Sequence, residues 1–338
     1  MTHEIKFLFE TLKSWQQLGK KSVFVSVVAL DGTSYRRPGV RMIISEKGEY
    51  AGAVSGGCVE KEIEFQAQSV FKTGKAKLIT YDGRLRIGCE GVMYILIEPV
   101  HLTEDLLNTF GLALEKRQSF VLVSWFNREF GESENSGTMI RLNGKPYALN
   151  PSFKEEMTTN LEKFSQTFGP LFQLIIFGAE HDAVELCKVA RLVGWEVTIV
   201  ASPEEAKSRD YFPGASVLIS PTYEQIDTSR IDEQTAVVLM SHGFNKDVRY
   251  LMALKNIFPA YMGMVGSFKR RERVLSMLME YCPDTTIEFL EQIHSPAGLS
   301  LGAESAAEIA ISIVAEILAK IRHQNPESLK NKTKAIHA

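Results

Sequence analysis

The chain has 338 residues, 45% of them apolar, which is enough to bury at least one complete hydrophobic core and is typical of two domains. Thirty-eight Lys and Arg residues against 41 Asp and Glu residues give a net charge of −3, which excludes a global field that recruits nucleic acid or an anionic membrane. No apolar run approaches the roughly 18 residues that span a bilayer, so the sequence predicts a cytoplasmic protein.

The first 150 residues predict a strand-rich α+β domain. Apolar residues at helical spacing open the chain, at Ile5, Leu8, Phe9, Leu12 and Trp15. Short β-branched or aromatic segments then predict strands at 22–30, 40–45, 50–54, 76–81, 92–99 and 119–126. One helix is expected among them, from about Val59 to Phe71. The polar segment 151–169 is expected to link this domain to the next and to be partly helical.

From residue 170 to residue 338 strands and helices alternate. Apolar runs predict strands at 171–178, 195–200, 215–220, 235–240 and 260–266. Helical patterns lie at 183–192, 248–255 and 270–279, and a long helix at 303–321 closes the chain. Strands buried on both faces that alternate with helices indicate a Rossmann-like, doubly wound parallel sheet. The predicted fold class is therefore α/β, with a strand-rich first domain.

The first strand-to-helix turn of the second domain departs from the dinucleotide-binding pattern. That pattern, Gly-x-Gly-x-x-Gly, lets the backbone approach a pyrophosphate above a helix N-terminus. Only Gly178 is retained here, and Glu180 replaces the second glycine with a negatively charged side chain. The strand at 195–200 continues as Ala201 and Ser202, without the acidic residue that binds a ribose hydroxyl. The sequence thus favours the fold but disfavours NAD(P).

Polar groups also follow the other strands of this domain. Ligands of open α/β sheets bind outside the carboxyl ends of the strands, so three loops are expected to meet there. The candidate residues are His242, Ser267, Lys269, Arg270, Arg271 and the segment 296–302, which includes Gly298. A lone histidine in a loop is usually structural. His242 stays a candidate site residue because three loops are expected to meet at the same edge of the sheet.

The four cysteines are widely separated, without a CxxC pair or zinc-ligand spacing, and are expected to be free thiols. Cys187 lies in an apolar helical stripe and Cys282 follows a helix, so both are expected to serve packing. Cys58 and Cys89 differ because each lies beside glycine.

Cys58 follows Gly56 and Gly57 and precedes a predicted helix. Glycines there can form an anion-binding nest, and a helix N-terminus or nearby cations favour the thiolate, which is a nucleophile and metal ligand. Arg36, Arg37 and Arg41 are suited to forked bonds with phosphate or an oxidised metal centre. The alternative is a tight turn with a buried thiol and a solvated arginine face.

Together these segments resemble the xanthine dehydrogenase accessory protein family (XdhC/CoxI-like), in order and over nearly the whole chain. The segments are GTSYRRPGVRM, GAVSGGCVE, GCEGVMYILIEP, IIFGAEH, VVLMSHGFNKD, YMGMVGSFKRR, IHSPAGLSLGAES and EIAISIVAEIL. The resemblance implies a protein that binds and protects molybdenum cofactor (molybdopterin). It also implies sulfuration of that cofactor with a cysteine desulfurase, and transfer to a xanthine dehydrogenase-type apoenzyme in purine catabolism.

By position, the resemblance implies that Cys58 and Cys89 are the thiols near the cofactor, with Cys58 meeting molybdenum or the sulfur that it receives. Arg36 and Arg37 of the RRPG segment belong to the same implied site. Two motifs depart from the family pattern. Glu90 interrupts the usual Cys-Gly-Gly, and Gly178, Ala179, Glu180 and His181 stand where Gly-Ala-Gly-His is usual. The nucleotide-like half is therefore expected to have an altered ligand or none.

Three classes of function remain open. The favoured class is a cofactor chaperone associated with xanthine dehydrogenase, or a component of that enzyme, rather than an independent oxidoreductase. The second is a nicotinamide- or flavin-dependent oxidoreductase, which only fold analogy supports. The third is a regulatory module that senses a nucleotide. Apolar residues on several faces of the last helix also suggest a homodimer, although burial within one domain would explain them equally.

Overall fold

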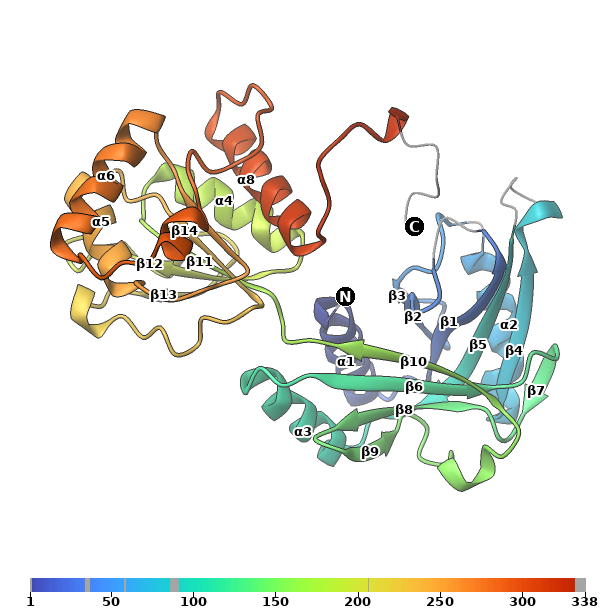
Figure 1. Cartoon of the computed structure of the whole chain (residues 1–338). Helices are drawn as coiled ribbons and strands as arrows, with labels where there is room; N and C mark the ends of the chain where they lie inside the picture. The colour runs from blue at the N-terminus through green and yellow to red at the C-terminus, as the bar shows by residue number, and fades with distance from the viewer. Residues whose placement is uncertain (1, 34–36, 58, 86–90, 206, 332–338) are drawn as a thin grey trace. The chain divides into compact units, whose positions relative to one another are not determined.

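The structure is a computed structural model that describes residues 2–33, 37–57, 59–85, 91–205 and 207–331. The chain divides into two compact units, Met1–Pro170 and Leu171–Ala338, coloured blue to green and green to red in Figure 1. Within the described residues, no helix is long and apolar enough to cross a membrane.

Unit 1 contains two antiparallel sheets. The first has the order β3 (Tyr50–Gly52), β2 (Arg41–Ser45), β1 (Ser22–Gly32), β5 (Gly91–Val100), β4 (Ala76–Asp82) and β7 (Gly131–Ser133). The second has the order β10 (Glu162–Phe168), β6 (Phe120–Phe126), β8 (Gly137–Leu142) and β9 (Lys145–Ala148). These strands, together with three helices, confirm the strand-rich α+β character expected for this half.

Alternating side chains of β1 enter two different cores. Phe24 points into the core that α1 (Thr2–Gln17), α3 (Glu104–Glu115) and the second sheet share. Val23 and Val25 point the other way, against α2 (Glu60–Thr73). Because successive strand residues face opposite sides, both faces of the first sheet are covered, and β1 is buried almost throughout.

The segment expected as a partly helical linker contains the short helix η2 (Glu155–Met157) and also contributes a strand to unit 1. Residues 162–168 form β10, which pairs along its whole length with β6 of the second sheet. Its alternating polar pattern reflects exposure of one face, and Phe168 stacks on Phe120 with ring centroids 5.0 Å apart. Only Gly169 and Pro170 separate this strand from the start of unit 2.

Unit 2 is a six-stranded parallel sheet, which confirms the predicted Rossmann-like fold. Its order is β13 (Ala215–Ile219), β12 (Glu196–Val200), β11 (Gln173–Phe177), β14 (Thr235–Leu239), β15 (Tyr261–Met264) and β16 (Ile293–His294). Helices α4 (His181–Leu192) and α8 (Ala306–Ile321) share one core with the sheet. Helices α5 (Phe244–Ala253), α6 (Phe268–Tyr281) and α7 (Ile287–Glu291) share the core on the other face.

The apolar breadth of the last helix is explained mostly inside unit 2. Ile313, Val314 and Ile317 of α8 are buried in the core shared with α4, while Ile311 is 51% exposed. The observation that suggested a homodimer therefore has an explanation within one domain. Cys187 is fully buried in the same core, and burial raises the pKa of its thiol to about 11, as expected of a packing cysteine.

Candidate functional site

Two regions contain the predicted site residues, and each is described separately. The first is formed by the loops of unit 1 around positions 37–41 and 53–60. The second is the carboxyl edge of the parallel sheet in unit 2. Four predicted site residues lie outside the described residues: Cys58, Cys89, Glu90 and Arg36. For these positions the structure describes only the neighbouring residues in the chain.

The turn before β2 is anchored to both sheets of unit 1. The amide of Gly39 donates to the Val27 carbonyl at 2.8 Å, and the Val27 amide donates to Val40 at 3.1 Å. Gly39 has a φ of +100°, and a Cβ there would lie 2.6 Å from the Oε1 atom of Gln166. Only glycine therefore fits this turn against β10.

Arg41 is the first residue of β2 and lies beneath that turn. Its Nη1 atom donates to the Gly39 carbonyl at 2.6 Å and to the Gln166 side chain at 2.5 Å. The guanidinium also lies 5.4 Å from the Phe168 ring centroid. Arg41 is 6% exposed, and burial lowers its pKa to about 10. Its observed contacts hold the turn together, whereas Arg37 at the same turn is exposed.

The loop before α2 folds around the carboxylate of Glu60. Oε1 accepts the amides of Val54 and Ser55 at 3.1 and 2.7 Å. Oε2 accepts the Ser55 hydroxyl at 2.5 Å and the Gly57 amide at 2.9 Å. Burial raises the pKa of Glu60, but these hydrogen bonds outweigh burial, so its pKa lies below the ordinary value. The Gly57 amide, which the sequence assigned to a nest for an external anion, thus bonds a carboxylate of the chain itself.

Glu60 is a residue whose role sequence reasoning missed. It is 9% exposed, and it lies at the first position of α2, where acidic residues are favoured by the helix dipole. A signal existed in the sequence, because an acidic residue three positions after a glycine at a helix start can accept backbone amides. An added Cβ would meet open space at both glycines, but Gly57 has a φ of +110°, which side chains other than glycine rarely adopt.

In unit 2, the first strand-to-helix turn contains a required glycine. Gly178 has a φ of +136°, and a Cβ there would lie 2.4 Å from the Met240 carbonyl oxygen. This close approach joins the ends of β11 and β14, the point at which the strand order reverses. Glu180 then precedes α4, which begins at His181, an exposed residue.

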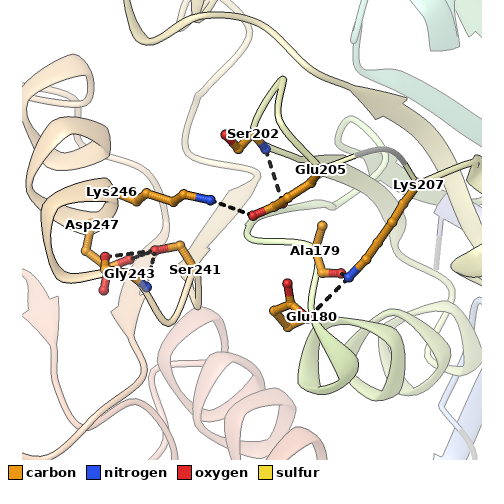
Figure 2. A network of polar contacts seen from close by, with 9 residues as sticks. All are labelled: Ala179, Glu180, Ser202, Glu205, Lys207, Ser241, Gly243, Lys246 and Asp247. Carbon is orange, nitrogen blue, oxygen red and sulfur yellow. Dashed lines mark hydrogen bonds and ion pairs between the residues drawn. The ribbon is translucent and has the colours of Figure 1, made fainter.

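Lys207 reaches over this turn. Its ammonium donates to the Ala179 carbonyl and lies 3.2 Å from the Glu180 carboxylate (Figure 2). The negative charge that was expected to repel a pyrophosphate is thus paired with a cation from the loop after β12. The place above the helix N-terminus where a dinucleotide fold holds phosphate is occupied by this Lys–Glu pair.

A second pair spans the ends of β12 and β14. Glu205 accepts the Ser202 amide at 3.3 Å, and its other oxygen lies 2.7 Å from the ammonium of Lys246 on α5 (Figure 2). The sequence lacks an acidic residue directly after β12, but Glu205 folds back to the strand end. Sequence reasoning missed this carboxylate because it lies three residues farther along the chain than Ser202.

The loop after β14 is fixed by a buried carboxylate. Asp247 accepts the Ser241 hydroxyl at 2.5 Å and the Arg270 guanidinium at 2.6 Å. Its side chain is 1% exposed, so this network is internal to the fold. His242 between these groups has a φ of +54°, and its Nε2 atom lies 3.3 Å from an Asp182 carboxylate oxygen. The histidine side chain remains 52% exposed and available to a ligand.

Ser267 and Gly298, two of the other predicted residues, have local structural contacts. The Ser267 hydroxyl caps α6 by accepting the Arg270 amide at 3.3 Å. Gly298 donates its amide to Glu316 of α8 at 2.8 Å, and a Cβ at Gly298 would lie 2.4 Å from the Ser312 hydroxyl. These contacts place the 296–302 loop against α8.

The two regions offer different chemistry. At the sheet edge of unit 2, four cationic or titratable side chains each face a carboxylate: Lys207, Lys246, Arg270 and His242. In unit 1, Arg37 is exposed beside loops whose backbone is fixed from below by Arg41 and Glu60. Among the described residues, no group of three or more His, Cys, Asp or Glu side chains could hold a metal ion.

The fold thus defines a two-unit protein with a strand-rich first half and a Rossmann-like second half. Residues 174–317 match the description "XdhC Rossmann domain", and residues 15–82 match "XdhC and CoxI family". The chain belongs to the XdhC and CoxI family.

Individual relatives resemble the chain over most of its length. It is 26% identical to the molybdenum cofactor insertion chaperone PaoD of Escherichia coli, over 96% of this chain and 90% of that protein. It is 28% identical to a Bacillus subtilis protein named as a probable xanthine dehydrogenase subunit, over 88% of this chain and 93% of that protein. A crystal structure described as a xanthine dehydrogenase from Bacillus halodurans is 26% identical, with a TM-score of 0.76 over 94% of this chain and 96% of the other.

Proposed function

We propose that this protein is a chaperone that binds molybdenum cofactor and transfers it to a xanthine dehydrogenase-type apoenzyme. The observation that carries the proposal is the similarity to PaoD along 96% of the chain, since that relative is named for molybdenum cofactor insertion. The similarity to a protein named as part of a xanthine dehydrogenase supports the same class of partner. The cofactor is the cargo of this protein, and it supplies the molybdenum centre that the recipient enzyme uses.

In this proposal the loops of unit 1 receive the cargo. Cys58 and Cys89 provide thiols, and Arg36 and Arg37 provide cations for the phosphate or oxo groups. The backbone amides of Val54, Ser55 and Gly57 are already bonded to Glu60, so we do not assign these three amides as anion ligands. Arg41 is likewise engaged with Gly39 and Gln166, and we assign it to holding the turn beneath the exposed Arg37.

The finer steps belong to the same proposal. A cysteine desulfurase would supply sulfur to the bound cofactor, Cys58 would be the thiol that holds the cofactor during this exchange, and the sulfurated cofactor would then serve an enzyme of purine catabolism. An independent nicotinamide-dependent oxidoreductase fits less well, because the Lys207–Glu180 pair lies where a dinucleotide phosphate would bind.

The proposal is tested by purifying the full chain from cells that make molybdopterin and measuring molybdenum, pterin and nicotinamide. We expect molybdenum and pterin in equal amounts, and loss of both in Cys58→Ala. Cys89→Ala should lower both. Cys282→Ala is the matched control, because Cys282 is half-buried behind α6 and packs with the core of that face.

A second readout is activation of a partner xanthine dehydrogenase apoenzyme by the purified protein. Full cofactor content and full activation with Cys58→Ala would overturn the role of that thiol. Bound nicotinamide without molybdenum would favour the oxidoreductase instead, and a bound nucleotide alone would favour a regulatory module.

A further inference from the structure

A groove runs along the outer face of α5, far along the chain from the loops of unit 1. Its volume is about 650 Å³, within the range of small-molecule sites. It is lined by Tyr223, Glu224, Asn245, Val248, Arg249, Met252, Ala253, Met277 and Tyr281. Every one of these residues is described by the structure, and we call this surface the α5 groove.

The lining comes from three elements. Residues of α5 at 245, 248, 249, 252 and 253 have the spacing of one helix face. Met277 and Tyr281 come from the last turns of α6, and Tyr223 and Glu224 from the short helix η4 (Tyr223–Gln225). The groove thus lies in the helical layer, and none of its lining residues belongs to the Lys–Glu pairs at the sheet edge.

One wall of the groove is a fixed aromatic platform. The Tyr223 ring packs 5.0 Å from the ring of Tyr250, which is 2% exposed. The guanidinium of Arg249 lies over the Tyr223 ring, 5.2 Å from its centroid. Thr222 and Gln225 form a capping box that fixes the backbone of η4. Successive ring contacts therefore connect the buried Tyr250 to Tyr223 and then to the exposed guanidinium of Arg249.

Arg249 differs from the arginines at the sheet edge in its partners. Arg270 is paired with a carboxylate at 2.6 Å, whereas no ion pair of Arg249 occurs among the described residues, although hydrogen bonds and, to a smaller extent, the charge of Arg249 lower the pKa of the nearby Glu224. The planar group of Arg249 is therefore free to stack against a second flat ring while its N–H groups donate at the edge. Met252 and Tyr281 extend the exposed apolar surface, at 38% and 61% exposure.

The polar groups of the groove indicate the class of ligand. Glu224 and Arg249 contribute one charge of each sign, so the groove does not favour a phosphate or another multiply charged anion. Glu224 accepts hydrogen bonds, Arg249 donates them, and the Asn245 amide does both. Flat aromatic, thioether and guanidinium surfaces with mixed donors and acceptors suit a ring that has both kinds of group on its edge.

From this combination we propose that the α5 groove binds a planar nitrogen heterocycle of the nucleobase type. The ring stacks on Arg249 and Tyr223, and its polar edge is bonded by Glu224 and Asn245. Stacking on such platforms contributes to base binding with little dependence on the particular base.

The experiment titrates the full chain with adenosine and cytidine by calorimetry and by saturation-transfer NMR. We expect saturable binding of both nucleosides, and at least a tenfold loss of affinity for adenosine in Arg249→Met. Tyr281→Ala, a second exposed position, should also weaken binding. The matched control is Arg209→Met, an exposed arginine on η3 (Arg209–Tyr211) outside the groove.

Three outcomes would overturn the proposal. The first is that neither nucleoside binds, and the second is that Arg249→Met binds adenosine as well as the unmodified protein. The third is that AMP binds more than tenfold tighter than adenosine, which would indicate a phosphate site. Thermal melts of each variant establish that it folds, and the molybdenum assay is independent because it reads a different ligand in unit 1.

Discussion

The loops of unit 1 and the sheet edge of unit 2 use charged side chains in opposite ways. In unit 1, Glu60 gathers three backbone amides and a hydroxyl, and Arg41 bonds a carbonyl and a side-chain amide. In unit 2, Lys207 and Lys246 each face a carboxylate. Charge in the loops of unit 1 thus sets the path of the backbone, whereas Lys207 and Lys246 at the sheet edge of unit 2 are neutralised by neighbouring carboxylates.

The largest effect is expected from Glu60→Ala. This change leaves three amides without their acceptor, those of buried Val54, half-buried Ser55 and exposed Gly57, so the free energy of unfolding should fall by about 3 kcal/mol. Urea denaturation measures it. The control is Glu64→Ala, an exposed residue of the same helix, with an expected change of roughly 0.5 kcal/mol or less. Equal effects of the two substitutions would show that Glu60 does not organise the loop.

A change in the free energy of unfolding of similar size but opposite sign is expected from Glu98→Gln, and only at high pH. Glu98 is 1% exposed in β5, and burial raises its pKa from 4.5 to about 7. The folded state thus binds a proton more tightly than the unfolded chain, so stability falls as pH rises from about 4.5 to 7.

Glutamine keeps an acceptor for the Thr138 amide, which donates to Glu98 at 2.8 Å, and it removes the charge. We therefore expect Glu98→Gln to be more stable than the unmodified protein by about 2–3 kcal/mol at pH 8 and nearly equal at pH 4.5. Melting curves at the two pH values test this. A pH-independent difference would show that the carboxyl group does not titrate as described.

A moderate effect is expected from Gln166→Leu. It removes the side-chain oxygen that accepts from Arg41 and so loosens the anchor between the turn and β10. The free energy of unfolding should fall by about 1–2 kcal/mol. Thr167→Val, at an exposed position of the same strand, is the control for β-strand effects. If the two variants unfold alike, the Arg41 anchor contributes little.

The smallest effect on stability, below about 1 kcal/mol, is expected from Glu180→Gly, because it breaks a partly exposed ion pair. Its effect on ligand binding is larger. The substitution restores Gly-Ala-Gly-His and frees Lys207 for phosphate, so NADH affinity should rise several-fold, and AMP affinity with it. Lys207→Met is the counterpart that should not gain affinity. Tight NADH binding by the unmodified protein, unimproved in Glu180→Gly, would show that this pair does not close the site.

The sequence predicted most elements because their hydrophobic periods are strong. β1 and β14 are buried almost throughout, and α2 begins one residue after its expected start. Several elements were missed, among them the short β7, α7 and β16. α3 lies between two segments read as strands, β8 and β9 are short partners of β6, and β10 is a polar strand with one exposed face. Such strands are recognised only by the partner with which they pair.

The sequence by itself determined the family resemblance and the parallel sheet, and it showed Gly178 as the one retained glycine of the dinucleotide-binding pattern. It also identified Arg37, Arg41 and His242 as candidate site residues, because residue type and local spacing can be read directly from the sequence. Only the tertiary structure decided what several of these charges do. Arg41 became an anchor because β10 brings Gln166 beneath it, and Glu180 lost its isolated charge because the loop after β12 returns Lys207 to it. Burial and pairing depend on segments far apart in sequence, and no local pattern encodes them.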